Sequence, residues 1–458
     1  MPLAASRMYQ PGATAPSWPW LAAGGGLLFV GIAAYLVSPK LGILALGLPA
    51  APLLVLYPQL GLLGVIALIP FDSIASLVPS RTFTLTRLVG MAVMGGWVVN
   101  LLVRRERVTL GTSAILLLAY VAFALISLGW APDPAESMQR VKTLVQLVLL
   151  YCMAVNLLRT PAMIERALDV LLVSTVLVSV VVILQYDPEA SSRASLTLGE
   201  TNTNPNYLAA TLVGPAVAAA ALGAARGRFG WWRFAAFGCL LLATIVTGSR
   251  GGLLALATGV AVIGVLRPRI GVRLALGVFL IVPTLPFLVP SQVLERQIER
   301  FQRLGEDRGS GRLDIWRVGA VMARENPVIG VGFGSFNREF YRYMYSGHAV
   351  VDPRWAQTKL WGGADPHNIY LRTAAELGAV GLTLLLLALA AHAAGVYRAY
   401  RRGGADRNRD NVLPVALLGM FAAFALMSST TDTVGTKEVW LLLALMQGAA
   451  LAVPGRIR

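Results

Sequence analysis

Long apolar runs separated by short polar stretches dominate the chain. A helix needs roughly 20 apolar residues to cross the hydrocarbon core of a membrane, and runs of this length predict helices because a backbone in lipid must satisfy its own hydrogen bonds. The pattern predicts an all-α polytopic membrane protein with about 12 transmembrane helices, because several runs are short for a full crossing. Up to fourteen hydrophobic segments can be recognised: 20–37, 41–57, 59–71, 88–103, 112–130, 142–158, 167–186, 207–225, 234–248, 251–266, 272–290, 368–397, 411–428 and 437–453.

The distribution of basic residues predicts how the segments are oriented. Cytoplasmic loops carry an excess of Lys and Arg, and the basic residues gather at 104–107, 159–166, 226–233, 267–273, 398–409 and 456–458. We therefore expect these loops and both termini to be cytoplasmic, and the segments 72–87, 131–141, 187–206, 249–250, 291–367 and 429–436 to face outward. The N-terminus shows no cleavage site after an isolated apolar core, so no removed signal peptide is expected.

One outward segment, 291–367, is too long for a simple connection. "SQVLERQIERFQRL" is typical of an amphipathic helix that lies on a membrane surface, and "GRLDIWRVGAVMARENP" predicts a second helix that stops before Pro327. "VIGVGFGSF" predicts a glycine-rich turn and "FNREFYRYMY" a further short helix. The predicted organisation is an N-terminal transmembrane bundle (1–290), a mostly helical cap (291–367) and C-terminal transmembrane helices (368–458).

Composition agrees with a membrane protein and argues against nucleic acid as a partner. Hydrophobic residues make up 56% of the 458 residues and charged residues 14%, against about a quarter charged in soluble domains. The net charge of +16 comes largely from arginines in the loops between spans. Cys152 and Cys239 both lie inside apolar runs, which predicts neither a disulfide nor a thiolate metal site.

The first candidate site is "GGADPHNIYLRTAAELGAVGL", where a polar loop becomes an apolar helix. Asp365 is placed to cap that helix, and His367 at the outer surface could act as a general base or bind a phosphate. Glu376 lies about 13 Å further along the helix. An ionisable residue at that depth indicates either function or a structural partner for an arginine. Gly378 and Gly381 are expected to serve close helix packing.

Arginines in two other motifs are candidate phosphate ligands. In "TGSRGG", Arg250 lies in a tight turn and could bind phosphate oxygens with its planar fork, or extend toward lipid headgroups. In "GRLDIWR", Arg312 falls in the first turn of the predicted helix. Arg317 could instead form a salt bridge with Asp314 three residues earlier.

The outer loop "GETNTNPNYLA" and the residues upstream of it form a further candidate region. Asn206 could bind sugar hydroxyls or serve the turn before the span, and Arg193 and Glu200 lie just upstream. The other histidines, His348 and His392, are expected to be structural. No phosphate-binding loop, D-x-D, HExxH or Cys/His cluster occurs, so no ATP, NAD or metal is predicted. One histidine with scattered arginines suits a substrate that has a pyrophosphate leaving group.

Four motifs resemble those of the O-antigen ligase and polymerase superfamily: "NPNYLA", "TGSRGG", "GRLDIWRVGAVMARENPVIGVGFGSF" and "HNIYLRTAAELGAVGL". The resemblance covers roughly residues 200–385 and implies a GT-C-like, usually twelve-span glycosyltransferase without cofactor or metal. It assigns the catalytic role to His367, the essential arginines to Arg250 and Arg312, and a further pyrophosphate contact to Arg193. Glu376, Arg317 and Asn206 are possible supporting residues.

The implied reaction is transfer of O-antigen polysaccharide from undecaprenyl pyrophosphate to a lipid A-core sugar. It would take place on the periplasmic face of the bacterial inner membrane, with inversion at the anomeric carbon. Alternatives within the superfamily are an O-antigen polymerase and a protein O-glycosyltransferase, which differ in the acceptor. The alternative from another class is a flippase for lipid-linked sugar, which predicts inverted repeats and ionisable residues near the membrane midplane. The sequence shows no repeats, and its polar residues cluster outside the spans.

Overall fold

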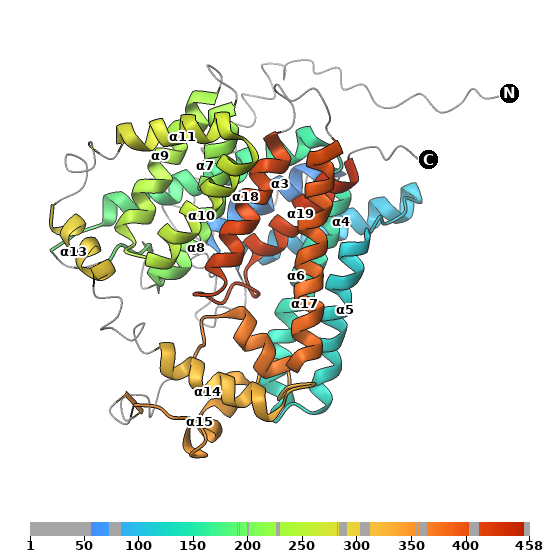
Figure 1. The fold of residues 1–458 in the computed structure, drawn as a ribbon. Helices are drawn as coiled ribbons and strands as arrows, with labels where there is room; N and C mark the ends of the chain where they lie inside the picture. Colours follow the sequence, from blue (N-terminus) through green and yellow to red (C-terminus); the bar gives the residue numbers. More distant parts are fainter. Residues whose placement is uncertain are drawn as a thin grey trace, which may run out of the picture.

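The structure, a computed structural model, describes residues 56–72, 84–189, 191, 193–198, 201–225, 230–281, 283, 291–302, 312–352, 355–356, 364–402 and 412–452. The predicted segment 20–37 and nearly all of 41–57 lie outside these residues. Each of the other hydrophobic segments coincides with a helix or most of one (Figure 1). The helices of these segments are α3 (Pro58–Leu68) with η1 (Ile69–Phe71), α4 (Leu85–Arg104), α5 (Thr112–Ile126) with η2 (Ser127–Gly129), α6 (Pro134–Leu157), α7 (Pro161–Gln185), α8 (Pro205–Ala225), α9 (Trp231–Val246), α10 (Arg250–Leu266), α11 (Pro268–Ile281), α17 (Ile369–Arg402), α18 (Val412–Met427) and α19 (Lys437–Ala452).

Among the described residues, six helices are long and apolar enough to cross a membrane: α4, α5 with η2, α6, α7, α8 and α17. Four shorter apolar helices cover 58–71, 231–246, 250–266 and 412–427. Two-residue strands, β1 (Thr197–Leu198) and β2 (Thr201–Asn202), pair antiparallel between α7 and α8. The prediction of an all-α polytopic membrane protein is confirmed, while the total of about 12 crossings stays a prediction.

Small residues allow the central helices to approach closely. The alanine-rich helix α8 is buried along most of its length and lies against α9, α10 and α18. A Cβ atom on Gly259 of α10 would lie 2.8 Å from the carbonyl oxygen of Gly419 on α18. Close backbone approach at small residues is how membrane helices gain packing contacts. These contacts hold the starts of α8 and α10, where two candidate site residues lie, near each other.

The outward segment contains the three predicted helices, α13 (Ser291–Gln302), α14 (Arg312–Glu325) and α15 (Phe336–Tyr345). Helices α14 and α15 lie at the end of the molecule where α17 begins, whereas α13 lies apart, near α8 and α9 (Figure 1). A second apolar cluster joins α14 to α15, with Val318 and Met322 buried against Phe336 and Phe340. Amphipathic helices of this kind need such a partner face to be stable in water.

The glycine-rich turn 327–336 clamps a kink in α17. Gly378 has φ 62° and ψ −161°, a conformation that other residues rarely adopt. The kink leaves backbone N–H and C=O groups of α17 without partners inside the helix, and the turn forms hydrogen bonds with them. These bonds run from Val331 N to Ala375 O (3.0 Å), Gly332 N to Glu376 O (2.8 Å), Ala379 N to Pro327 O (2.8 Å) and Val380 N to Val328 O (3.2 Å). Gly378 was expected to serve helix packing; it instead allows this kink and the close approach of the turn. The first turns of α17 are thereby set at an angle to the rest of the helix.

We expect Gly378→Ala to destabilise the protein by about 2 kcal/mol or more, because strain at positive φ adds to an overlap with the Val328 backbone. Thermal unfolding in detergent measures this effect. Gly347→Ala is the matched control, since Gly347 also has positive φ (80°) but has no atom within 4 Å of the added carbon. Equal losses of Tm in the two variants would show that the clamp contributes nothing.

Candidate active site

His367 lies in an unusual backbone conformation directly before α17. Its φ of 47° is in the left-handed region, which is uncommon for residues other than glycine. Asp365 Oδ1 accepts a hydrogen bond from His367 N at 2.8 Å, which holds the turn. The prediction that Asp365 caps the helix is wrong: Asn368 Oδ1 accepts from the N–H groups of Tyr370 and Leu371, both at 3.0 Å. Asn368 is closer to the first turn and reaches those donors, so Asp365 is left to fix His367.

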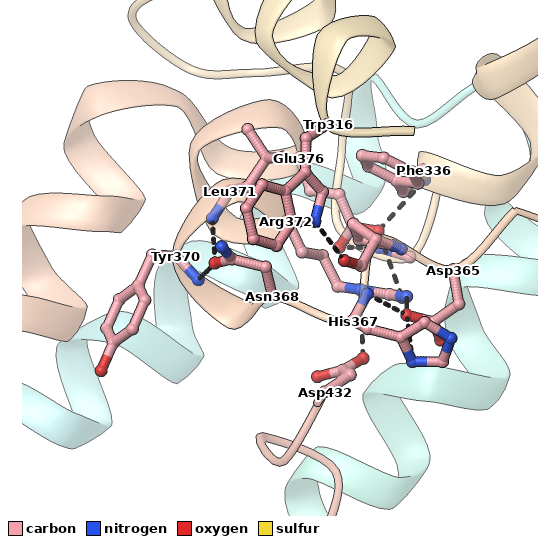
Figure 2. A network of polar contacts seen from close by, with 12 residues as sticks. Trp316, Phe336, Asp365, His367, Asn368, Tyr370, Leu371, Arg372, Glu376 and Asp432 are labelled. Carbon is pink, nitrogen blue, oxygen red and sulfur yellow. Dashed lines mark hydrogen bonds and ion pairs between the residues drawn. The ribbon is translucent and has the colours of Figure 1, made fainter. Parts of the chain in front are cut away.

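Arg372, one turn into α17, is the centre of a buried charge cluster (Figure 2). Its side chain is 7% exposed, and its Nη2 lies 2.9 Å from Asp365 Oδ1. Its Nε lies 3.0 Å from Asp432 Oδ2, on the loop between α18 and α19. These contacts are ion pairs whose N–H directions do not meet hydrogen-bond geometry. The guanidinium also lies over the Phe336 ring, 5.7 Å from its centre.

Glu376 has the contacts of a structural anchor. Its two carboxylate oxygens accept from Gly334 N (2.8 Å) and Phe336 N (3.1 Å), in the glycine-rich turn. Arg372 Nη1 lies 3.9 Å away. The side chain is 1% exposed. Of the two interpretations of this residue, the structural partner of an arginine is the one that the geometry matches.

The surroundings of His367 favour its neutral form. Burial lowers the pKa of His367 below its ordinary value of 6.5, and the guanidiniums of Arg312 and Arg372 lower it further, whereas Asp365 and Asp432 oppose the shift. Burial alone would raise the pKa of Asp365, but the Arg372 guanidinium and the His367 N–H hold it below its usual value. The result is a neutral imidazole beside an ionised carboxylate. The Nδ1 atom of His367 lies 3.7 Å from Asp365 Oδ1.

Two arginines of α14 have different surroundings. Arg312 begins the helix, and Trp316, one turn later, donates from Nε1 to Pro366 O at 2.8 Å. This bond attaches the start of α14 to the residue before His367. The Arg312 guanidinium is close enough to act electrostatically on the His367 imidazole. Arg317 forms the alternative salt bridge with Asp314 at 3.0 Å, and its side chain is 53% exposed. Arg312 therefore belongs to the His367 group, and Arg317 pairs with the buried carboxylate of Asp314.

Arg193, Asn206 and the turn before α10 come together as a second group. Arg193 donates from Nη2 to Asn206 Oδ1 at 2.6 Å and from Nε to Thr247 O at 2.9 Å. Arg250 is the first residue of α10, where Ser249 caps the helix by accepting from Gly252 N. Glu200 lies outside the described residues. The next residue after Asn206, Tyr207, connects this group to the first, because its ring centre lies 6.3 Å from that of His367.

A cavity of about 400 Å³ adjoins this junction. Residues of α3, α4, α6, α8, α18 and α19 line it, most of them apolar, and Tyr207 forms part of its wall. Its polar lining includes the Lys437–Asp72 ion pair and Glu438, which accepts from Thr211 at 2.9 Å. An apolar cavity with a few polar groups is the usual form of a ligand site. Among the described residues, no cluster of three or more His, Cys, Asp or Glu is arranged to hold a metal ion.

Sequence reasoning overlooked Arg372, Asp432 and Tyr207. Arg372 had a usable signal, since it is an ionisable residue four positions before Glu376 in a helix otherwise rich in apolar residues. Asp432 lies in "TTDTVGTKE", an outward loop that carries no motif. Tyr207 lies in the quoted "NPNYLA" motif, but nothing local connects it to a residue 160 positions later. His348 pairs with Glu325 on the surface at 2.5 Å, and His392 is buried against Tyr151, so both have structural contacts.

Fold and site together define a polytopic membrane protein in which the loops before α8 and α17 and the starts of α10 and α14 gather a histidine and several arginines beside a cavity. Residues 235–386 match the family described as O-antigen ligase. The matched segment contains Arg250, Arg312 and His367, and the match agrees with the resemblance to the O-antigen ligase and polymerase superfamily that the motifs indicate. The match supports a membrane enzyme of that type.

A chain from a solved structure described as "Structural coordination of polymerization and crosslinking by a peptidoglycan synthase complex" is similar over 74% of this chain and 96% of its own. The identity is 20% and the TM-score 0.41, too low to inform fold or function. No curated protein matches the sequence.

Replacing Arg372 should test how much the charge cluster matters. Arg372→Met leaves three carboxylates without their cation, and we expect a loss of about 3–5 kcal/mol, as for other broken buried ion pairs. Thermal unfolding of the purified protein in detergent is the measurement. Arg324→Met removes an exposed arginine of α14 and should change stability by less than about 0.5 kcal/mol. A small effect of Arg372→Met, similar to that of Arg324→Met, would show that the buried ion pairs of Arg372 do not stabilise the protein.

Proposed function

We propose that this protein transfers O-antigen polysaccharide from undecaprenyl pyrophosphate to a sugar of the lipid A core. The reaction takes place on the periplasmic face of the bacterial inner membrane, without metal or ATP. The observation that carries the proposal is the position of His367, a half-buried histidine with a lowered pKa. It lies between arginines of the outward segments and a cavity within the membrane helices.

His367 acts as the general base. As the neutral form, it accepts the proton of the acceptor hydroxyl while the acceptor oxygen forms a bond to the anomeric carbon. The bond between that carbon and the phosphate oxygen breaks, and undecaprenyl pyrophosphate leaves with the electron pair. Attack from the side opposite the leaving group inverts the anomeric centre. Asp365, fixed by Arg372, keeps the imidazole in place and faces the imidazolium that forms.

Arginines stabilise the charge that develops on the pyrophosphate. Arg312 lies near His367. Arg250 is the first residue of α10, and Arg193 lies in the loop before α8. Preorganised cations at a developing charge are among the largest contributions to catalysis. Supporting this placement, Asn206 and Thr247 hold the Arg193 guanidinium in a fixed position.

The lipid anchors explain why the site lies beside a membrane cavity. Both substrates are amphiphiles, so their sugars and phosphates are presented at the outer surface of the membrane. The cavity of about 400 Å³, lined mainly by apolar side chains, can hold part of a polyprenyl chain. A donor placed this way has its pyrophosphate near Tyr207 and His367.

The activity should depend on pH through His367. The neutral imidazole is the active form and its pKa lies below 6.5, so kcat/KM should rise with pH and reach half its maximum below pH 6.5. The groups that face His367 are Asp365, Asp432, Arg312, Arg372 and Tyr207. The rate of transfer from a purified donor, measured between pH 4.5 and 8.5 in roughly half-unit steps, checks this. A midpoint above pH 7 would argue against His367 as the base.

Transfer in vitro tests the reaction itself. Purified protein is supplied with undecaprenyl-pyrophosphate-linked glycan and lipid A core in the presence of EDTA, and the product is resolved by mass. We expect wild-type transfer, and a loss of about 10²–10⁴-fold in His367→Ala, the usual contribution of a general base. His348→Ala, which removes an exposed histidine of the outward segment, is the matched control and should remain active.

Two results would change the assignment. If the wild type lengthens lipid-linked glycan and leaves lipid A core unmodified, the protein is an O-antigen polymerase. If His367→Ala retains full activity, the general base lies elsewhere.

A further inference from the structure

Arg372 also lines a second, smaller cavity of about 150 Å³. We propose that this cavity is a subsite for one sugar of the glycan substrate, with Asp432 and Arg140 as the groups that bind its hydroxyls. This inference rests on the proposed function and deepens it. Neither residue belongs to the motifs that the family resemblance assigns.

The walls of this cavity offer both hydrogen-bond acceptors and donors. The Oδ1 atom of Asp432 is buried, and in the described part of the chain it has no hydrogen-bond partner. Arg140 forms no ion pair with the residues that the structure describes; its Nη2 donates to the Asn337 amide oxygen at 3.2 Å when that side-chain amide is turned over to satisfy its neighbours. Thr143, Thr373 and Tyr120 add hydroxyl groups. A buried carboxylate oxygen without a donor is costly, so this site favours a ligand that supplies one.

The balance of charge favours a neutral, hydroxylated ligand over an anion. Two guanidiniums (Arg140 and Arg372) and two carboxylates (Glu376 and Asp432) line the cavity. A phosphate here would face both carboxylates. A sugar hydroxyl both donates and accepts, so it can donate to Asp432 Oδ1 and accept from Arg140. The other two charged groups, Arg372 and Glu376, already have partners, because Glu376 lies beside Arg372 and accepts hydrogen bonds from the glycine-rich turn.

The position of the cavity connects it to the rest of the site. Thr143, Leu147 and Gly435 line both this cavity and the larger apolar one. Arg372 and Asp432, which line the cavity, also lie beside His367 (Figure 2). A sugar bound here therefore lies between the space for a lipid chain and the catalytic base. It is either the first sugar of the lipid-linked donor or the sugar of the acceptor.

Binding without turnover tests the proposal. Affinities are measured in detergent for undecaprenyl-pyrophosphate-linked glycan, for undecaprenyl pyrophosphate without sugar, and for lipid A core. Asp432→Asn and Arg140→Gln should each weaken binding of one of the two glycolipids by about tenfold, the usual effect of losing a hydrogen bond to a charged group. The glycolipid affected identifies the sugar as that of the donor or of the acceptor. Binding of the sugar-free carrier should not change.

Controls separate this proposal from folding and from the proposed function. Arg324→Gln, at an exposed position of α14, should bind all three probes as the wild type does. Arg140→Gln leaves the ion pairs of Arg372 intact, so it remains informative if Asp432→Asn fails to fold. Unchanged affinities in Arg140→Gln and in a folded Asp432→Asn would overturn the sugar subsite alone. An equal loss for the sugar-free carrier would show a phosphate site and also overturn it. A wild-type protein that binds neither glycolipid would refute the proposed function as well.

Discussion

The burial of one guanidinium, that of Arg372, is the constraint on which the site depends. Removing this charge from water is costly, and only good pairing compensates for it. The three carboxylates that face it come from three segments: Asp365 from the loop before α17, Asp432 from the loop between α18 and α19, and Glu376 from α17 itself. Because Glu376 is also bound by the glycine-rich turn between α14 and α15, the cluster joins these two helices to the membrane helices.

The same cluster holds the backbone turn at His367 and acts electrostatically on its imidazole. Asp365 is held by Arg372 and accepts from the His367 backbone, so these contacts stabilise the left-handed turn at His367. The kink at Gly378 tilts the first turns of α17, which carry Arg372 and follow the capping residue Asn368, relative to the rest of the helix. Strained backbone of this kind is kept where the surrounding structure over-determines it. Structure and proposed chemistry thus rest on one set of contacts.

Local patterns were enough to predict the helices, and tertiary pairing was not visible in them. Apolar runs located the spans from 59 onward, and Asn326-Pro327 located the end of α14, because both signals are set by neighbouring residues. The Arg317–Asp314 pair was foreseen for the same reason, as it spans one helical turn. Asp432 and Tyr207 lie 65 and 160 positions from His367, and no periodicity connects them. The role of Asp365 was misread because Asn368 competes for the same cap.

In the proposed reaction, His367, Arg250 and Arg312 meet at the pyrophosphate of a membrane-anchored glycan. An experimental structure of the protein in a lipid nanodisc with undecaprenyl-pyrophosphate-linked glycan would locate that pyrophosphate. We expect it in contact with Arg250 and Arg312, with the lipid chain in the larger cavity and His367 facing the anomeric carbon. A glycolipid bound with its pyrophosphate away from these residues would rule out the proposed catalytic arrangement.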